Sequence, residues 1–174
     1  MKKITKLTIG LWSLFLVILL MGLAGTQFIY KLGKNSKAIL KDNYASIEWA
    51  KEMMQQLDNM NNAEVSKARA AAVQFDSKLK LEESNITEIG EKETVKQLRA
   101  NFEYYQQNPS SQLLSTSIRT NLYKISELNM QALERKNGLA QKTADNAILY
   151  ISLLLAVCVL ICFSLIFNIP SFLE

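Results

Sequence analysis

Histidine is absent from the 174-residue chain, and the only two cysteines, Cys158 and Cys162, lie within one uncharged apolar stretch. The sequence also has no phosphate-binding glycine loop and no nucleophile motif. Catalytic and metal centres in proteins are mostly assembled from these groups. We therefore expect no enzyme activity from this chain, no metal ion and no other cofactor.

Two pairs of neighbouring acidic residues remain as candidates for proton transfer, Glu82 with Glu83 and Glu91 with Glu93. Acidic side chains near helix ends are usually solvated and interact favourably with the helix dipole. We expect both pairs to lie in solvent and to take no part in acid–base chemistry.

The chain has almost no surplus of charge between its two ends. Residues 28–146 carry 17 Lys and Arg against 15 Asp and Glu, a net charge of +2. Part of the formal +4 of the whole chain comes from Lys2, Lys3 and Lys6. A nucleic-acid surface needs a concentrated positive field, so we expect no nucleic-acid partner.

Long apolar runs are what the sequence does contain. Leu7–Thr26 and Ala147–Phe167 hold no charged residue, and a helix of that length spans about 30 Å, the thickness of a bilayer's hydrocarbon core. A helix also satisfies its own backbone groups in lipid. The sequence therefore predicts transmembrane helices at 7–27 and 147–167, with the lipid bilayer as a partner.

Charge near the first run predicts the orientation. Positive residues hold the adjoining end of a span in the cytoplasm, and Lys2, Lys3 and Lys6 precede the first run. We expect 1–6 and 168–174 in the cytoplasm and 28–146 outside it. A cleaved secretory signal with its site at Gly22–Ala24 is the alternative, and the length of the apolar run favours an anchor.

Helical periodicity fills the segment between the spans. The first expected helix has a stripe with steps of four and three residues, ends at Asn61–Asn62 and continues the first span without interruption. A second helix follows, and a third starts at a capping box formed by Asn85 and Glu88 and stops at Asn108–Pro109. Ser110 or Ser111 caps a fourth, which runs into the second span with Gly138 as a soft point.

The inward positions expected on these helices are Ile39, Asn43, Ser46, Ala50, Met53, Leu57 and Met60 on the first; Val65, Ala68, Ala72, Phe75 and Leu79 on the second; Ile89, Val95, Leu98, Phe102 and Tyr105 on the third; and Leu114, Ile118, Leu122, Ile125, Leu128, Ala132 and Leu139 on the fourth. A chain that leaves the membrane and returns needs an even number of crossings. The predicted fold is all-α, an antiparallel up-down four-helix bundle at 28–146 flanked by two transmembrane helices.

Polar residues on the apolar stripe are the main candidates for a site. Asn43 and Ser46 occupy positions where leucine would stabilise more, so each needs a partner, a water or a ligand. A buried Asn that fixes helix register, a ligand contact and simple solvent exposure remain open. Arginines could hold an anionic ligand, although a single arginine on a bundle is usually on the surface. The four are Arg69, Arg99, Arg119 and Arg135.

The stretch Asp42–Ile47, followed by Met53 on the same helix, resembles the sensory region of KinB-like bacterial sensor histidine kinases. Asn85–Glu88 followed by Gly90–Glu91 adds to this resemblance, which extends more broadly to the four-helix-bundle sensors of chemoreceptors and nitrate sensors. It implies a periplasmic domain on the bacterial inner membrane and a parallel homodimer. With the polar stripe, it makes Asn43, Tyr44, Ser46 and Arg69 the candidate ligand-binding residues.

The last residues, Asn168–Leu173, resemble the lead-in to a HAMP relay domain, with Pro170 as the joint that passes a signal on. The sequence stops at Glu174, before any relay, phospho-accepting histidine or ATP-binding domain. We expect either a piece of a longer protein or a short membrane protein. The hypothesis is a signal-input module for an unidentified periplasmic small molecule or protein, with a helical scaffold or partner-binding protein, or a chemoreceptor sensor, as the alternative.

Overall fold

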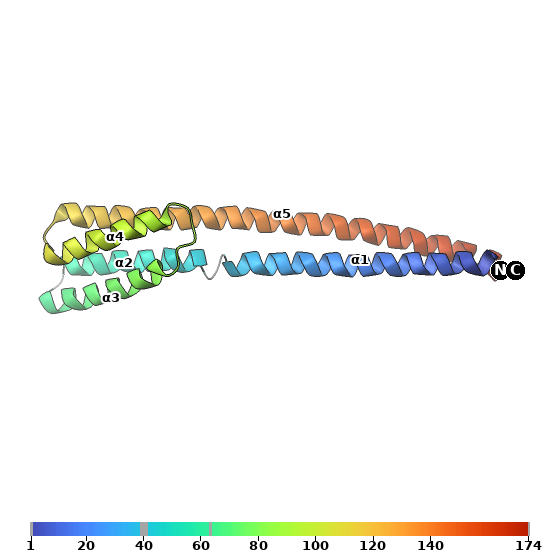
Figure 1. Ribbon diagram of the computed structural model, residues 1–174, viewed down its shortest axis with the longest axis horizontal. Coiled ribbons are helices and arrows are strands. Elements are labelled where there is room, and N and C mark those ends of the chain that lie inside the picture. Colours follow the sequence, from blue (N-terminus) through green and yellow to red (C-terminus); the bar gives the residue numbers. More distant parts are fainter. Residues whose placement is uncertain (1, 39–41, 63, 174) are drawn as a thin grey trace. The chain divides into compact units, whose positions relative to one another are not determined.

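The computed structural model describes residues 2–38, 42–62 and 64–173, without the side chains of 2–7, 35, 37, 38, 62 and 168–173. Within these ranges the chain forms helices and no strand (Figure 1). The helices are α1 (Lys2–Ala38), α2 (Tyr44–Asn62), α3 (Val65–Glu83), α4 (Glu91–Gln107) and α5 (Gln112–Leu173). The predicted all-α class is therefore confirmed.

The chain divides into two compact units, which are described separately below. Unit 1 comprises Met1–Asn35 and Gly138–Glu174, and unit 2 comprises Ser36–Asn137. The boundary falls inside α5, which is one helix of 62 residues. The prediction that the fourth bundle helix runs into the second apolar run is confirmed. The expected continuity of the first span with the next helix falls on 39–41, outside the described residues.

Unit 2 has one apolar core, to which α2, α3, α4 and the first part of α5 all contribute. Phe75 of α3 and Phe102 of α4 stack at its centre, with ring centroids 4.2 Å apart. The core consists of Ala50, Met53, Leu57, Phe75, Leu79, Val95, Leu98, Phe102, Tyr105, Ile118, Leu122 and Ile125. All twelve were predicted as inward positions from their steps of three and four residues, because such residues share one face of a helix.

Three of the predicted inward positions are exposed instead, namely Val65, Ile89 and Leu139. Val65 and Leu139 are 79% and 57% exposed, because Val65 opens α3 and Leu139 lies beyond the core along α5. On α3 Ala72 packs against the core as predicted but is only partly buried, whereas Ala71 is buried. Ile39 lies outside the described residues.

The start of the third helix is also corrected. α4 begins at Glu91, and Ile89, predicted to point inward, is 98% exposed. Gly90 precedes the helix in a left-handed conformation, with φ of 85°. This conformation ends the connection from α3, and α4 starts six residues after Asn85, the predicted capping residue. The end of α4 at Gln107 and the hydrogen bond from the Leu114 N–H to Ser111 Oγ agree with the sequence.

Gly90→Ala should destabilise unit 2 by about 1 kcal/mol, because an alanine Cβ is strained at positive φ. No atom lies within 4 Å of the position where that Cβ would stand, so the loss comes from the backbone alone. Thermal unfolding of the two proteins measures it. Gly138→Ala is the matched control, since Gly138 is helical and equally open; equal effects of the two substitutions would contradict the expectation.

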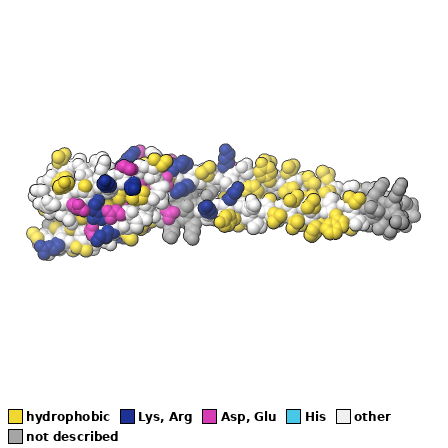
Figure 2. All heavy atoms as spheres, viewed as in Figure 1, with side chains coloured by type: hydrophobic (Ala, Val, Ile, Leu, Met, Phe, Trp, Pro, Cys, Tyr) yellow, Lys and Arg dark blue, Asp and Glu magenta, His cyan; other side chains and the backbone are white. Residues whose placement is uncertain are grey.

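Unit 1 pairs α1 with the second part of α5. A Cβ on Gly10 would meet Leu165 Cδ2 at 2.5 Å, and Phe28 stacks on Tyr150, so the two helices run antiparallel and close together. Large apolar side chains such as Trp12, Leu160 and Phe167 stand exposed on its outside. Figure 2 shows hydrophobic side chains over this unit and charged ones over unit 2. By length and composition, the two helices could cross a membrane.

Candidate functional site

A group of polar side chains lies buried in unit 2 where the start of α2, the end of α3, the start of α4 and the middle of α5 meet. We call it the buried polar cluster. Each of its members has no exposed surface, and they are Asn43, Ser46, Glu82, Glu91 and Asn129. Buried polar groups are destabilising unless they find partners, so the partners of each determine what the cluster can do.

Asn43 lies at the centre of these contacts. Its Nδ2 donates to Glu88 Oε1 and to Asn129 Oδ1, both at 2.9 Å, and its Oδ1 accepts a hydrogen bond from Lys136 Nζ. One side chain thus connects α2 with the α3–α4 connection and with α5. Simple exposure of Asn43 is excluded, and its contacts are those expected of a buried Asn that fixes register.

Glu91, the first residue of α4, accepts three hydrogen bonds. Its Oε2 receives the backbone N–H groups of Thr87 at 2.7 Å and Glu88 at 2.9 Å, and its Oε1 receives Asn129 Nδ2. Three N–H donors stabilise a carboxylate in a buried position. Glu91 therefore holds the α3–α4 connection closed and joins it to α5.

Glu88 forms the charged edge of the site. Its Oε2 accepts Arg135 at 2.7 Å and its Oε1 accepts Lys136 at 3.0 Å. Burial acts to raise the pKa of Glu88, but the hydrogen bonds from Asn43 and Lys136 and the charges of Lys136 and Arg135 outweigh it and lower the pKa. The ionised Glu88 thus ties the connection to the part of α5 that precedes the unit boundary.

Asn85 does not cap a helix as predicted. Its Nδ2 donates instead to Ser46 Oγ at 2.9 Å and to the Asp42 carbonyl oxygen at 2.8 Å, both at the start of α2. A side chain amide can leave the backbone of its own segment when a neighbouring helix offers better acceptors. Ser46 is therefore satisfied within the chain, like Asn43.

Glu82 is the exception in the cluster. Both of its carboxylate oxygens are buried, and neither makes a hydrogen bond to the residues that the structure describes. Burial raises the pKa of Glu82 to about 7; the nearby Ser46 hydroxyl acts against this, and the negative Glu91 adds to it. Solvent exposure of Glu82 and Glu91, expected from the sequence, is wrong: both side chains lie on the inward face of their helices, 0% exposed.

The structure does not bring the four predicted ligand-binding residues together. Asn43 and Ser46 point into the cluster, whereas Tyr44, between them in sequence, is 56% exposed. Arg69 is exposed near the other end of the unit, in a pocket that includes Met60. Because Ser46 and Met60 are fourteen residues apart on one helix, that end lies about 21 Å away.

The other arginines that the sequence singled out are paired within the chain. Arg99 of α4 binds Glu83 and Asp76 of α3. Arg135 binds Glu88, and Arg119 binds Asp58. The pairs of Arg99 and Arg119 connect neighbouring helices, and that of Arg135 connects α5 to the α3–α4 connection.

Pro170 was predicted as a relay joint. Helix α5 continues through it to Leu173, and its side chain lies outside the described residues. The backbone therefore shows no break at this position.

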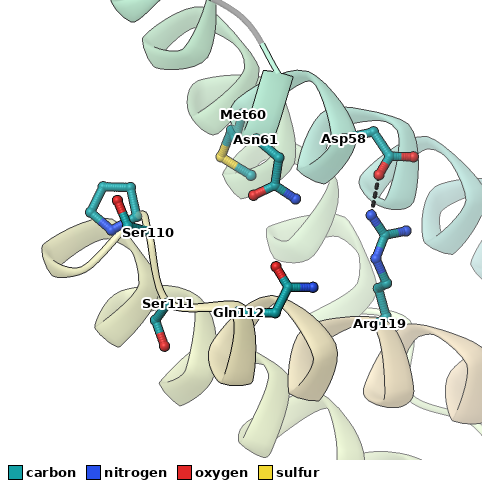
Figure 3. Close-up of a pocket in the computed structure, with 8 residues that line it drawn as sticks. Asp58, Met60, Asn61, Ser110, Ser111, Gln112 and Arg119 are labelled. Atoms are coloured by element: carbon teal, nitrogen blue, oxygen red, sulfur yellow. Dashed lines mark hydrogen bonds and ion pairs between the residues drawn. The ribbon is translucent and has the colours of Figure 1, made fainter.

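A polar pocket of about 500 Å³ occupies the end of unit 2 away from the cluster. Figure 3 shows Asp58 and Asn61 of α2 facing Gln112 and Arg119 of α5 across it, with the ion pair between Asp58 and Arg119 at one side. Among the described residues, no three acidic, histidine or cysteine side chains gather closely enough to hold a metal ion. The pocket offers amide and hydroxyl groups, and the two charged side chains that line it, Asp58 and Arg119, already bind each other.

Sequence reasoning placed Glu82 and Glu91 in solvent and missed Asn129 and Lys136 altogether. All four lie on the stripes of their helices: Glu91 and Asn129 stand in the regular steps of buried positions along α4 and α5, and Glu82 extends the stripe of α3 by one step. Lys136 also continues these steps on α5, four residues after the buried Ala132, and is partly buried. No family model, no curated protein and no solved structure matches this chain.

Proposed function

We propose that the chain is the signal-input module of a bacterial two-component sensor kinase. In this proposal, 7–27 and 147–167 cross the inner membrane, and 28–146 form a periplasmic antiparallel four-helix bundle. The chain acts as a parallel homodimer, and Pro170 leads into a cytoplasmic relay. Exposed apolar side chains in unit 1 and charged ones in unit 2 support the membrane and water assignments.

The observation that carries this proposal is the continuity of α5. Its first part supplies Ile118, Leu122 and Ile125 to the core of unit 2, and the same helix contains the uncharged run Ala147–Phe167. A helix without a break transmits an axial or rotational shift along its length. A change of packing in unit 2 would thus be passed to the span by the backbone itself.

The buried polar cluster supplies an element whose packing could change. It joins α2, the α3–α4 connection and α5 through Asn43, Glu91 and Asn129. A stimulus shifts such an equilibrium only if it binds one arrangement better than another. In the proposal, the stimulus alters this cluster and α5 moves in response.

An insertion series in α5 tests transmission. We expect one to four alanines inserted after Gln141, in a chimaera that joins the chain to the relay and kinase of a reporter sensor, to change autophosphorylation periodically. Each inserted residue rotates the span by about 100° relative to unit 2, since a helix has about 3.6 residues per turn.

The matched control places the same alanines after Ser110, in the connection between α4 and α5. These insertions do not change the rotation of the span relative to Ile118 along α5. Autophosphorylation should therefore not vary with the helical period. Output that ignores the phase of α5 altogether would contradict signalling and favour the helical scaffold.

A further inference from the structure

The pair formed by Glu82 and Glu91 is the feature of unit 2 that its packing explains least. Both carboxyl groups are completely buried, and they face each other between the end of α3 and the start of α4. Two ionised carboxylates in contact without a cation between them repel strongly in a low-dielectric interior. The pair is therefore stable in this position when it holds a proton.

The partners of the two groups decide which one carries that proton. Glu91 accepts three N–H donors, from Thr87, Glu88 and Asn129, and these favour its carboxylate. Glu82 accepts no hydrogen bond from the described residues. When two acids occupy such different environments, the group without donors takes the proton.

The charged and polar groups around Glu82 come from three helices. On α2 it faces the Ser46 hydroxyl, and on α4 it faces the carboxylate of Glu91. The positive charges of α5 in this region, Arg135 and Lys136, are engaged by Glu88 instead. Of these groups only the Ser46 hydroxyl favours a negative charge on Glu82, and its effect is smaller than that of burial.

We propose that Glu82 and Glu91 form a proton-binding site and that loss of its single proton is the stimulus to which the module responds. The part concerning a response rests on the proposed signalling function, whereas the proton site does not. On deprotonation, the O–H bond of neutral Glu82 breaks, the proton passes to water and a carboxylate remains beside Glu91. The module would thus report the acidity of its surroundings.

Movement follows from the contacts of Glu91. A charged Glu82 is relieved by separation of the end of α3 from α4 and by entry of water. Glu91 is hydrogen-bonded to Asn129, and the neighbouring Glu88 to Lys136, so a displaced connection pulls on two positions of α5. Release of the proton therefore acts on the helix that contains the second apolar run.

Infrared titration of the full chain in lipid nanodiscs tests the proton site directly. Ordinary carboxyl groups are ionised above about pH 6, so a neutral carboxylic acid band that persists there marks a perturbed group. Burial raises the pKa of Glu82 to about 7, and the band should disappear with a midpoint near that value.

Three variants make this titration decisive. Glu82→Gln should abolish the band, and Glu103→Gln, the same change at an exposed position of α4, should leave it intact. Glu91→Gln removes the neighbouring charge and should shift the midpoint to lower pH. Absence of the band in the unaltered chain, or its survival in Glu82→Gln, would overturn the proposal.

Stability supplies a second readout. A group whose pKa is raised by folding stabilises the folded state at low pH and loses that effect as pH rises toward the raised value. The ratio of folded to unfolded unit 2 should fall by up to about tenfold per pH unit between about pH 4.5 and about pH 7. Glu82→Gln should lack this fall and Glu103→Gln should keep it; the same pH dependence in all three proteins would count against the site.

The two proposals fail in distinguishable ways. One outcome is autophosphorylation of the chimaera that follows the phase of α5 and yet is the same at pH 5 and pH 8, about two units below and one unit above the midpoint. In that case the proton stimulus is wrong and the proposed signalling function stands. If the infrared band titrates with Glu82 but insertions in α5 have no effect, the proton site stands and signalling is wrong.

Discussion

Replacing Phe75 with alanine should lower the free energy of unfolding of unit 2 by about 3–5 kcal/mol. Phe75 is fully buried, and its ring stacks on Phe102 with centroids 4.2 Å apart. The substitution removes most of a ring from the centre of a core to which four helices contribute, and the surrounding side chains can fill the space only in part. The loss would be a large share of the stability of a domain of this size.

Trp49 provides the measurement, because it packs against the core and the only other tryptophan, Trp12, lies in the first apolar run. In a Trp12→Phe background, the fluorescence of Trp49 reports urea unfolding of unit 2 in nanodiscs. Val73→Ala is the control on the same helix: Val73 is exposed, so its loss should change stability by less than about 0.5 kcal/mol. Similar losses for both variants would show that the stacked pair is not the centre of the core.

The pattern of apolar residues predicted this core because each helix repeats its buried positions with steps of three and four. The same spacing rule also identifies buried polar residues. On α5 the regular steps from Ile118 pass through Leu122 and Ile125 to Asn129, which is buried. The prediction from the sequence chose the neighbouring Leu128 as the inward position, and Leu128 is only partly buried. Asn129 was therefore overlooked because an apolar residue was preferred to the position that the regular spacing indicates.

The α3–α4 connection could not be predicted in the same way. Asn85 and Glu88 fit a capping box locally, yet in the structure they bind Ser46 and Asn43 of α2. Which partners Asn85 and Glu88 bind depends on how closely α2 approaches the connection, and this tertiary effect has no local signal in the sequence. A second error came from grouping Asn43 with Tyr44: Asn43 is buried, whereas Tyr44, the next residue, is exposed.

Polar contacts occupy both ends of the core of unit 2, and the apolar residues lie between them. At the end away from the buried polar cluster, Tyr105 donates to Asn61 and Asn61 donates to Ser115, so α2, α4 and α5 are joined there too. A shift of any one helix by a turn would leave such groups without partners. The two sets of contacts therefore specify the alignment of the helices, at a lower stability than leucine would give.

Glu91→Ala should destabilise unit 2 by about 3–5 kcal/mol at pH 5. It leaves three donors without their acceptor, the backbone N–H groups of Thr87 and Glu88 and the Asn129 side chain. Each buried donor that loses its partner costs about 1–3 kcal/mol, and water entering the space offsets part of the sum. The urea titration that follows Trp49 measures the total, and amide hydrogen exchange at Thr87 and Glu88 shows whether the connection opens first.

The pH dependence of this loss distinguishes hydrogen bonding from charge. At pH 8, about one unit above the pKa of Glu82, the unaltered protein suffers repulsion between two carboxylates. Glu91→Ala removes that repulsion, so its penalty should be smaller at pH 8 than at pH 5. Glu91→Gln keeps one acceptor oxygen for the backbone N–H groups and should lie between alanine and the unaltered chain at pH 5. A penalty for Glu91→Ala that is equal at both pH values would mean that the charge of Glu91 does not act on Glu82.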